Sequence, residues 1–318
     1  MLTNQTWWAT TIQPRSQPRE FGMNSMRSSV LGIPFDLIDY AAAIEQIDWW
    51  RRSRQHRYVT LTNAHGVMLS RRDPELKSAL RGASLVLPDG ISIVLAARML
   101  RCPDRGRVTG PSLLLRLCQW GLERGYRHYF YGGAEGVADL LAERLRAKYP
   151  GLQVAGTYSP PFRDLTDDED RRIVQRINDS KSDIVWVGLG APKQEKWMAR
   201  HAERLTSTTM IGVGAAFDFH SGNARWAPAW IRSIGCEWAF RLALEPRRMW
   251  RRNLGNSLFV GLVGKQCLQQ YLSFGDSNSD GVQLAGDRGV VSSDAFGRAR
   301  DASSAALAPE TSRDHRAA

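Results

Sequence analysis

Short apolar runs alternate along this chain with segments of helical periodicity. Six of the runs are rich in β-branched and aromatic residues and are predicted strands: 57–62, 84–88, 126–132, 152–158, 183–190 and 208–218. Helix-start signals lie between them, because Asp73 precedes Pro74 and Thr166 stands three residues before Glu169. Apolar strands that alternate with helices predict a Rossmann-like α/β fold, with a largely parallel sheet covered by helices on both faces.

This alternating pattern occupies only the middle of the chain. Residues 1–30 are polar and lack the continuous apolar run of a secretory signal, so we expect a loose leader there. Ser, Ala, Gly and Asp dominate 271–318, which predicts a disordered tail. The remainder divides into a catalytic domain at 31–224 and a basic helical appendage at 225–270. No segment approaches the roughly 18 apolar residues of a membrane-spanning helix, so we expect the chain not to cross a membrane by itself.

The composition indicates a basic globular protein. Its 318 residues are 43% hydrophobic, and 43 Lys and Arg against 32 Asp and Glu give a net charge of +11. This surplus favours phosphates, anionic lipid or nucleic acid as partners without choosing among them. The four cysteines stand singly, which favours a reduced, cytosolic compartment over a disulfide framework. The six histidines show no metal-binding spacing, so we expect no metal site.

The predicted strands end in loops that carry polar residues and glycines. In this fold class, ligands bind at the carboxyl ends of the strands. Asp89 follows the second strand, and it is either a helix cap or turn residue, or a catalytic carboxylate with a raised pKa. Gly132 and Gly133 follow the third strand in a GGAEG loop that resembles a phosphate loop but matches neither G-x-G-x-x-G nor a Walker sequence.

The stretch GLGAPKQEKW follows the fifth strand. Its Ala-Pro pair predicts a helix whose first turn holds Lys193, Gln194 and Glu195. A lysine there opposes the helix dipole, so we interpret Lys193 as a group that holds an anionic ligand, and Glu195 as the acid that a helix start favours. No Asp-x-Asp triplet occurs in a strand-end loop, so a sugar-nucleotide enzyme of this kind would offset diphosphate charge with Arg, Lys and backbone N–H groups.

The segment 225–252 combines arginine with tryptophan. It holds seven arginines, two acidic residues and four tryptophans. Solvated charge runs usually mix Lys with Glu and contain few aromatics, so this composition predicts an anion-facing, interfacial surface. Pro246 is predicted to open a helix, and the apolar run 257–264 follows. We expect both segments to lie along a bilayer surface, with tryptophan at headgroup depth.

Several motifs occur in unbroken order between about Leu31 and Leu254: NAHGVMLSRRDPEL, LVLPDGISIVLAARML, RVTGPSLL, YFYGG, GLGAPKQEKW, GVGAAFDFHSG and GCEWAFRLALEPRRMWRR. In this set the chain resembles the WecG/TagA/CpsF family of bacterial glycosyltransferases. The resemblance implies transfer of N-acetylmannosamine, or a related hexose or uronic acid, from a UDP-sugar to a saccharide on undecaprenyl diphosphate. It further implies polysaccharide biosynthesis at the inner face of the cytoplasmic membrane, without a metal or another cofactor.

The resemblance also assigns roles to residues. It implies Asp89 as the catalytic base, with Asn63 and Arg107 beside it. The predicted substrate-binding residues are Thr62, Gly132, Gly133, Lys193, Gln194, Asp218, Arg241, Arg247, Arg248 and Arg251. The chain departs from the family pattern at Trp226, where an arginine is usual, and at Cys236, where a leucine is usual.

Two other classes stay open at this point. A nucleic-acid-binding α/β protein would account for the basic charge and the Arg-Trp segment. A Rossmann-type oxidoreductase or sugar-nucleotide epimerase shares the fold class, although the chain lacks G-x-G-x-x-G after its first strand. The donor sugar, the acceptor saccharide, the pathway and the oligomeric state, homo-oligomer included, also stay open.

Overall fold

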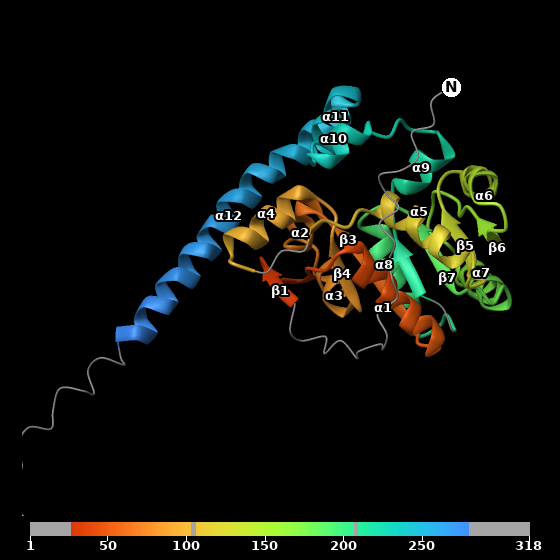
Figure 1. Ribbon diagram of the computed structural model, residues 1–318, viewed down its shortest axis with the longest axis horizontal. Coiled ribbons are helices and arrows are strands. Elements are labelled where there is room, and N and C mark those ends of the chain that lie inside the picture. The colour runs from red at the N-terminus through yellow and green to blue at the C-terminus, as the bar shows by residue number, and fades with distance from the viewer. Residues whose placement is uncertain (1–26, 103–105, 207–208, 280–318) are drawn as a thin grey trace, which may run out of the picture. The chain divides into compact units, whose positions relative to one another are not determined.

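The predicted sheet is present in the structure. The computed structural model describes residues 27–102, 106–206 and 209–279, and it leaves out the side chains of 248–256 and 273–279. Within these residues, six strands form one parallel sheet in the order β4-β3-β8-β7-β5-β6 (Figure 1). The strands are β3 (Arg57–Thr62), β4 (Leu85–Pro88), β5 (Arg127–Gly132), β6 (Gln153–Tyr158), β7 (Ile184–Gly188) and β8 (Thr209–Gly212). The Rossmann-like α/β prediction is confirmed.

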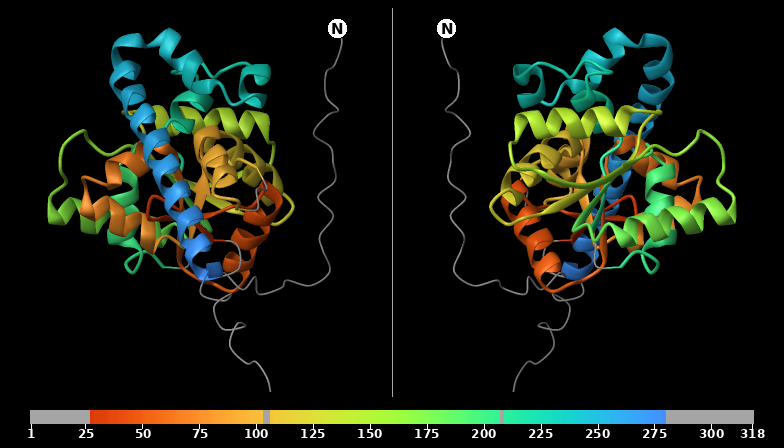
Figure 2. Two further views of the ribbon diagram at one scale, coloured as in Figure 1. Left: turned by 90° about the vertical axis from the view of Figure 1, so that its left-hand side faces the viewer. Right: turned by 90° about the vertical axis from the view of Figure 1, so that its right-hand side faces the viewer.

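Helices cover both faces of this sheet (Figure 2). One core cluster packs against α2 (Ala64–Ser70), α3 (Pro74–Gly82), α4 (Ile91–Met99), α7 (Asp167–Asp179) and α8 (Lys193–His201). The other packs against α1 (Tyr40–Arg52), α5 (Gly110–Gly121), α6 (Val137–Lys148) and α9 (Ala216–Ser221). The two clusters arise because neighbouring strand residues point to opposite faces. On β7, Val185 joins the first cluster and Trp186 joins the second.

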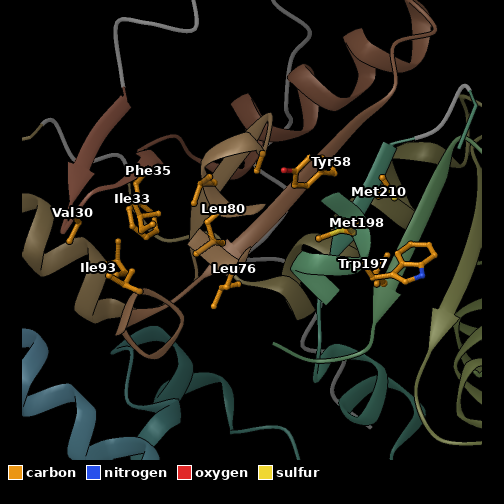
Figure 3. Packing of buried hydrophobic residues seen from close by; sticks show 14 of the residues in the cluster. Val30, Ile33, Phe35, Tyr58, Leu76, Leu80, Ile93, Trp197, Met198 and Met210 are labelled. Atoms are coloured by element: carbon orange, nitrogen blue, oxygen red, sulfur yellow. The ribbon is translucent and has the colours of Figure 1, made fainter. Parts of the chain in front are cut away.

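The predicted helix starts are also confirmed. Asp73 accepts a hydrogen bond from the Leu76 N–H at 3.0 Å, and Thr166 forms a capping box with Glu169. Asp73 additionally forms an ion pair with Lys196 of α8 at 2.7 Å. The start of α3 is thereby fixed against α8, and Figure 3 shows Leu76 and Leu80 of α3 within the first core cluster.

An antiparallel hairpin precedes the sheet, and its first strand corrects the predicted leader. The hairpin consists of β1 (Arg27–Val30) and β2 (Ile33–Asp36), so 27–30 belong to the fold and the boundary at residue 30 is wrong. The cause is a set of contacts distant in sequence. Arg27 pairs with Asp36 at 2.9 Å and donates to the Ser84 carbonyl at 2.8 Å, while Asp36 accepts from the Val86 N–H at 2.8 Å. Residues 1–26 of the predicted leader lie outside the described residues.

The C-terminal part of the described chain is helical, as predicted. It contains α10 (Ala229–Ser233), α11 (Glu237–Leu244) and α12 (Pro246–Ser279), so Pro246 does begin a helix. The contacts between residues divide the chain into two units, 1–271 and 272–318. Helix α12 continues to Ser279, past the end of the appendage that we predicted at residue 270. Residues 280–318 of the predicted tail lie outside the described part of the chain.

One face of α12 is fixed to the domain. Phe259 and Val263 are buried in the first core cluster, and Gln266 Nε2 donates to the Ser29 carbonyl at 2.8 Å. Gln266 Oε1 accepts from the Leu31 N–H at 2.9 Å. The run 257–264, which we expected along a bilayer surface, therefore gives one helical face to the protein core and leaves only the opposite face exposed.

Replacing Phe259 tests how much this packing stabilises the fold. Phe259 is 2% exposed, so Phe259→Ala leaves a cavity and should lower the free energy of unfolding by about 3 kcal/mol. The neighbouring Leu258 is 52% exposed, so Leu258→Ala should change it by less than about 0.5 kcal/mol. Urea unfolding measures both variants. Equal losses in the two variants would contradict the docking of α12 through Phe259.

Candidate functional site

The adjacent strands β3 and β4 bring the first site residues together at their carboxyl ends. Thr62 ends β3, and its carbonyl oxygen accepts a hydrogen bond from the Asp89 N–H at 3.0 Å. Asn63 caps α2, with its Oδ1 accepting from the Gly66 N–H at 3.2 Å. Gly90, not Asp89, is the N-cap of α4, and no side chain caps that helix. The interpretation of Asp89 as a helix cap is therefore wrong.

The Asp89 carboxyl lies in a mixed electrostatic environment. Burial, helped by the negative charge of Glu237, raises its pKa from 3.8 to about 7. The positive charge of Arg107, a hydrogen bond from the Gly110 N–H and the positive charge of Arg241 oppose this rise. The residue as a whole is half-buried. A carboxyl that titrates near neutral pH is suited to accept a proton from a substrate.

Arg107 connects this edge of the sheet with the appendage. Its guanidinium forms an ion pair with Glu237 of α11 and donates to the Arg232 carbonyl of α10 at 2.5 Å. Arg241 lies one turn after Glu237 on α11, with its guanidinium 5.6 Å from the centre of the Phe219 ring. The charges of Arg107 and Arg241 thus both act on the Asp89 carboxyl, whereas the catalytic and substrate-binding roles of these residues stay predictions.

Trp226, where the resemblance predicts an arginine, packs among aromatic and basic side chains. The Arg232 guanidinium lies over its ring, 3.8 Å from the centroid. The Phe219 ring stacks with it at 6.3 Å, and the His220 ring meets it edge-on at 5.0 Å. This cation–π and aromatic cluster joins α9 to the appendage, and it places the positive charge on Arg232 instead of on residue 226.

Helix α8 begins at the predicted place, but two residues of its first turn face inward. Gln194 and Glu195 are 4% and 3% exposed, and Gln194 Nε2 donates to Glu195 Oε1 at 2.9 Å. Gln194 also lies against β8, where a Cβ at Gly212 would be 3.2 Å from its Nε2.

Glu195 is more than the first-turn acid that we expected from the sequence. Burial raises its pKa, and its Oε2 has no hydrogen-bond partner among the described residues. Its side chain shares a helical face with buried Met198, three residues on, and this spacing is a signal that could have revealed its burial.

No described contact joins the other predicted site residues to Asp89, Arg107 or Arg241. Gly132 and Gly133 are explained by packing, because a Cβ at Gly132 would lie 2.5 Å from the backbone carbon of Gly188, and Gly133 has φ +75°. Lys193 is exposed and forms no ion pair within the described part of the chain. Asp218 is half-buried in the first turn of α9.

The last predicted arginines lie on α12. Arg247 is exposed there, whereas the side chains of Arg248 and Arg251 lie outside the described residues. For these residues, and for Lys193, Asp218 and the two glycines, a role in substrate binding stays a prediction.

The appendage exposes large apolar side chains. Trp230, Ile234 and Trp238 are 67%, 59% and 50% exposed. Across the described helices, no stretch has both the length and the apolar character needed to span a bilayer. The residues with described placement also contain no group of three or more His, Cys, Asp or Glu side chains that could hold a metal ion.

Comparisons with known proteins agree on one family. A family model described as "Glycosyl transferase WecG/TagA/CpsF family" matches residues 28–273. The chain is similar to proteins named N-acetylglucosaminyldiphosphoundecaprenol N-acetyl-beta-D-mannosaminyltransferase. The one from Bacillus spizizenii is 31% identical over 194 residues, which cover 61% of this chain and 73% of the relative. The one from Staphylococcus aureus is 26% identical over 243 residues, covering 76% and 91%.

Asp89→Asn tests the electrostatics of this site through protein stability. The carboxyl keeps its proton to about pH 7 in the folded chain, whereas its ordinary pKa is 3.8. The protonated carboxyl therefore adds to the free energy of unfolding below about pH 4, and this addition is lost as the pH rises to about 7. Between these values, the variant should gain free energy of unfolding relative to wild type by up to about 1.4 kcal/mol per pH unit.

Urea unfolding of both proteins between about pH 5 and pH 8 checks this trend. Asp164→Asn, at an exposed position, is the matched control and should not show it. A difference between Asp89→Asn and wild type that stays constant over this range would contradict the raised pKa.

Proposed function

Because the chain belongs to the WecG/TagA/CpsF family of glycosyl transferases, we propose that it transfers an N-acetylmannosamine-like sugar from a UDP-sugar to a saccharide on undecaprenyl diphosphate. A related hexose or uronic acid is the second donor class. The product would enter cell-surface or exopolysaccharide biosynthesis. Relatives whose names describe transfer to N-acetylglucosaminyldiphosphoundecaprenol support the lipid-linked acceptor.

The observation that carries this proposal is a carboxyl with a pKa of about 7 beside two guanidinium groups. In the proposed reaction, Asp89 accepts the proton of an acceptor hydroxyl while the hydroxyl oxygen bonds to the anomeric carbon of the donor. The bond from that carbon to UDP breaks, and UDP leaves with the electron pair. Arg107 and Arg241 stabilise the negative charge that grows on the leaving diphosphate.

We propose that these arginines replace a metal ion as the counter-charge to the diphosphate. Arg247, Arg248 and Arg251 would add to them from α12. Asn63 and Gln194 would orient the sugar, and Thr62 and Lys193 would contribute hydrogen bonds to the sugar nucleotide.

Incubation with a panel of UDP-sugars and a soluble prenyl-diphosphate saccharide tests the reaction. Mass spectrometry should detect an acceptor heavier by one N-acetylhexosamine, with hexose and uronic acid as the alternative increments. Thermal-shift measurements with UDP, NAD and an oligonucleotide separate the other classes, and we expect stabilisation by UDP alone. Stabilisation by NAD would favour the oxidoreductase, and salt-sensitive stabilisation by the oligonucleotide would favour the nucleic-acid-binding protein.

Asp89→Asn should lower the transfer rate by at least about 100-fold, because it removes the proposed base. In wild type, the rate should rise with pH and level off above about pH 7, since only the ionised carboxylate accepts a proton. Initial rates across the pH range, with Asp164→Asn as the control, measure both effects. Near-normal turnover by a folded Asp89→Asn protein would exclude Asp89 as the base.

We also propose peripheral attachment to the inner face of the cytoplasmic membrane through the appendage. The exposed Trp230 and Trp238, together with the surrounding arginines, suit an anionic lipid surface. The double variant Trp230→Ala, Trp238→Ala should bind anionic vesicles about 10-fold more weakly in co-sedimentation. Phe162→Ala is the control, because Phe162 is 83% exposed but lies between β6 and α7. Unchanged binding by the double variant would exclude this surface.

A further inference from the structure

Trp226 has no role in the mechanism above, yet it lies in a closed network of contacts around the proposed base. The residue is half-buried on the segment that joins α9 to α10. Its ring stacks with Phe219 at 6.3 Å and meets the His220 ring edge-on at 5.0 Å, and both of these residues belong to α9. Trp226 is therefore fixed on the α9 side by two aromatic neighbours.

His220 connects Trp226 with the start of α5. Its Nε2 lies 2.9 Å from the Pro111 carbonyl oxygen, and because a carbonyl can only accept, this nitrogen donates. Burial, together with the charges of Lys148 and Arg232, lowers the pKa of His220 to about 4, against the effect of the Pro111 hydrogen bond. The imidazole is thus neutral at neutral pH, and its hydrogen bond fixes the edge that it presents to Trp226.

Arg232 contacts the other side of Trp226. Its guanidinium lies 3.8 Å from the Trp226 ring centroid, and its Nε is buried without a hydrogen-bond partner in the described part of the chain. Burial lowers the pKa of Arg232, and the nearby charge of Arg107 acts in the same direction. Glu237 and Tyr40 oppose this change. The aromatic face of Trp226 is therefore a main contact that fixes the direction of the Arg232 side chain.

The backbone of Arg232 carries this contact to the proposed base. Its carbonyl accepts from the Arg107 guanidinium at 2.5 Å and from the Gly235 N–H at 3.2 Å. Gly235 has φ +79°, and a Cβ there would lie 2.9 Å from the Cβ of Ile91, the first residue of α4. Because Ile91 follows Asp89 by two residues, the turn after α10 packs against the strand end that carries Asp89.

Arg107 closes the network. The neighbouring Val108 N–H donates to the Pro88 carbonyl at 3.1 Å, which fixes the Arg107 backbone beside the end of β4. The Arg107 guanidinium reaches the appendage, where it pairs with Glu237. The contacts thereby return to the start of α5, where Pro111 binds α9. We call this set the Trp226 network, and its members are Pro111, His220, Trp226, Arg232 and Arg107.

We propose that Trp226 is a positioning residue: by holding the Arg232 guanidinium it fixes α10, and α10 keeps Arg107 and the start of α11 beside Asp89. The charges that act on the Asp89 carboxyl are those of Glu237, Arg107 and Arg241. Trp226 and Arg232 act on Asp89 through the position of these three groups. This inference rests on the proposed function for its catalytic consequence, because Asp89 is the proposed base.

Loosening α10 should shift the titration of Asp89 in one direction. Burial and the charge of Glu237 are the two largest causes of its raised pKa, and both weaken when the appendage moves away from the sheet edge. The opposing charge of Arg107 stays near, because Val108 fixes its backbone independently of the appendage. Loss of the Trp226 network should therefore lower the pKa of Asp89 toward its ordinary value of 3.8.

Four variants separate this role from a general effect on the fold. Trp226→Ala removes the aromatic face, whereas Trp226→Phe keeps one. Arg232→Met removes the guanidinium but keeps the apolar stem and the backbone carbonyl that Arg107 binds. Phe162→Ala removes an aromatic ring that is 83% exposed between β6 and α7, and it is the control.

Carbon-13 NMR of protein labelled at its aspartate carboxyls measures the titration without any substrate. The signal that is absent from Asp89→Asn identifies Asp89. We expect wild type to titrate near pH 7, and Trp226→Ala and Arg232→Met to titrate at least about one pH unit lower. The double variant should titrate no lower than either single variant, because both remove the same contact. Trp226→Phe and Phe162→Ala should titrate as wild type does.

Transfer assays give a second readout. The pH above which the rate levels off should fall by the same amount in Trp226→Ala and Arg232→Met, which a loss of stability alone would not produce. Thermal unfolding checks that each variant is folded. If Trp226→Ala is not folded, the comparison of Arg232→Met with wild type carries the same conclusion.

The inference is overturned if Asp89 titrates at or above the wild-type pH in the folded Trp226→Ala and Arg232→Met proteins. Additive shifts in the double variant would also overturn it, since the two residues would then act separately, and so would an equal shift in Phe162→Ala. Titration of wild-type Asp89 near pH 4 would overturn it together with the role of Asp89 as the base. Failure to transfer sugar from any UDP-sugar would overturn the proposed function alone, because the NMR titration needs no substrate.

Discussion

The site depends on the position of one guanidinium group. Arg107 pairs with Glu237 and binds the Arg232 carbonyl, and its charge also lowers the pKa of Asp89. Glu237 acts on Asp89 in the opposite direction. Glu237 lies on α11, so its charge reaches the Asp89 carboxyl only when α11 is docked on the sheet edge. The appendage therefore adjusts the proton affinity of the proposed base, in addition to supplying Arg241 for the proposed leaving group.

The strand order explains why the polar loops converge. The chain leaves β3 for β4 on one side of the sheet and returns to β8 on the other side, so β3 lies between two strands from different parts of the sequence. Loops that diverge at such a point leave a crevice at the carboxyl ends of the strands. Asn63 follows β3 and Asp89 follows β4, whereas Gln194 follows β7, which lies on the other side of β8. Asn63 is held by the Gly66 N–H, Asp89 by the Thr62 carbonyl, and Gln194 by the Gly190 carbonyl.

The structural features that depend on short stretches of sequence could be predicted. The six strands follow from apolar runs, and the helix starts at Asp73 and Thr166 follow from capping chemistry. The first hairpin was missed because RSSV is polar, and what stabilises it is the contact of Arg27 with Asp36 and with the distant Ser84 carbonyl. The burial of Glu195 was missed for the same kind of reason, since a first-turn acid usually faces solvent. The proximity of Arg107 to Asp89 came from the family resemblance, because no local pattern joins the two residues.

The buried carboxyls of Asp89 and Glu195 differ in the groups that stabilise their charged forms. Asp89 has the positive charges of Arg107 and Arg241 near it, so it can ionise near neutral pH. Glu195 has only the neutral amide of Gln194 and its own backbone to stabilise the charged form. A group that can change its charge near pH 7 suits proton transfer. This difference in environment is why the proposed proton transfer falls to Asp89 and not to Glu195.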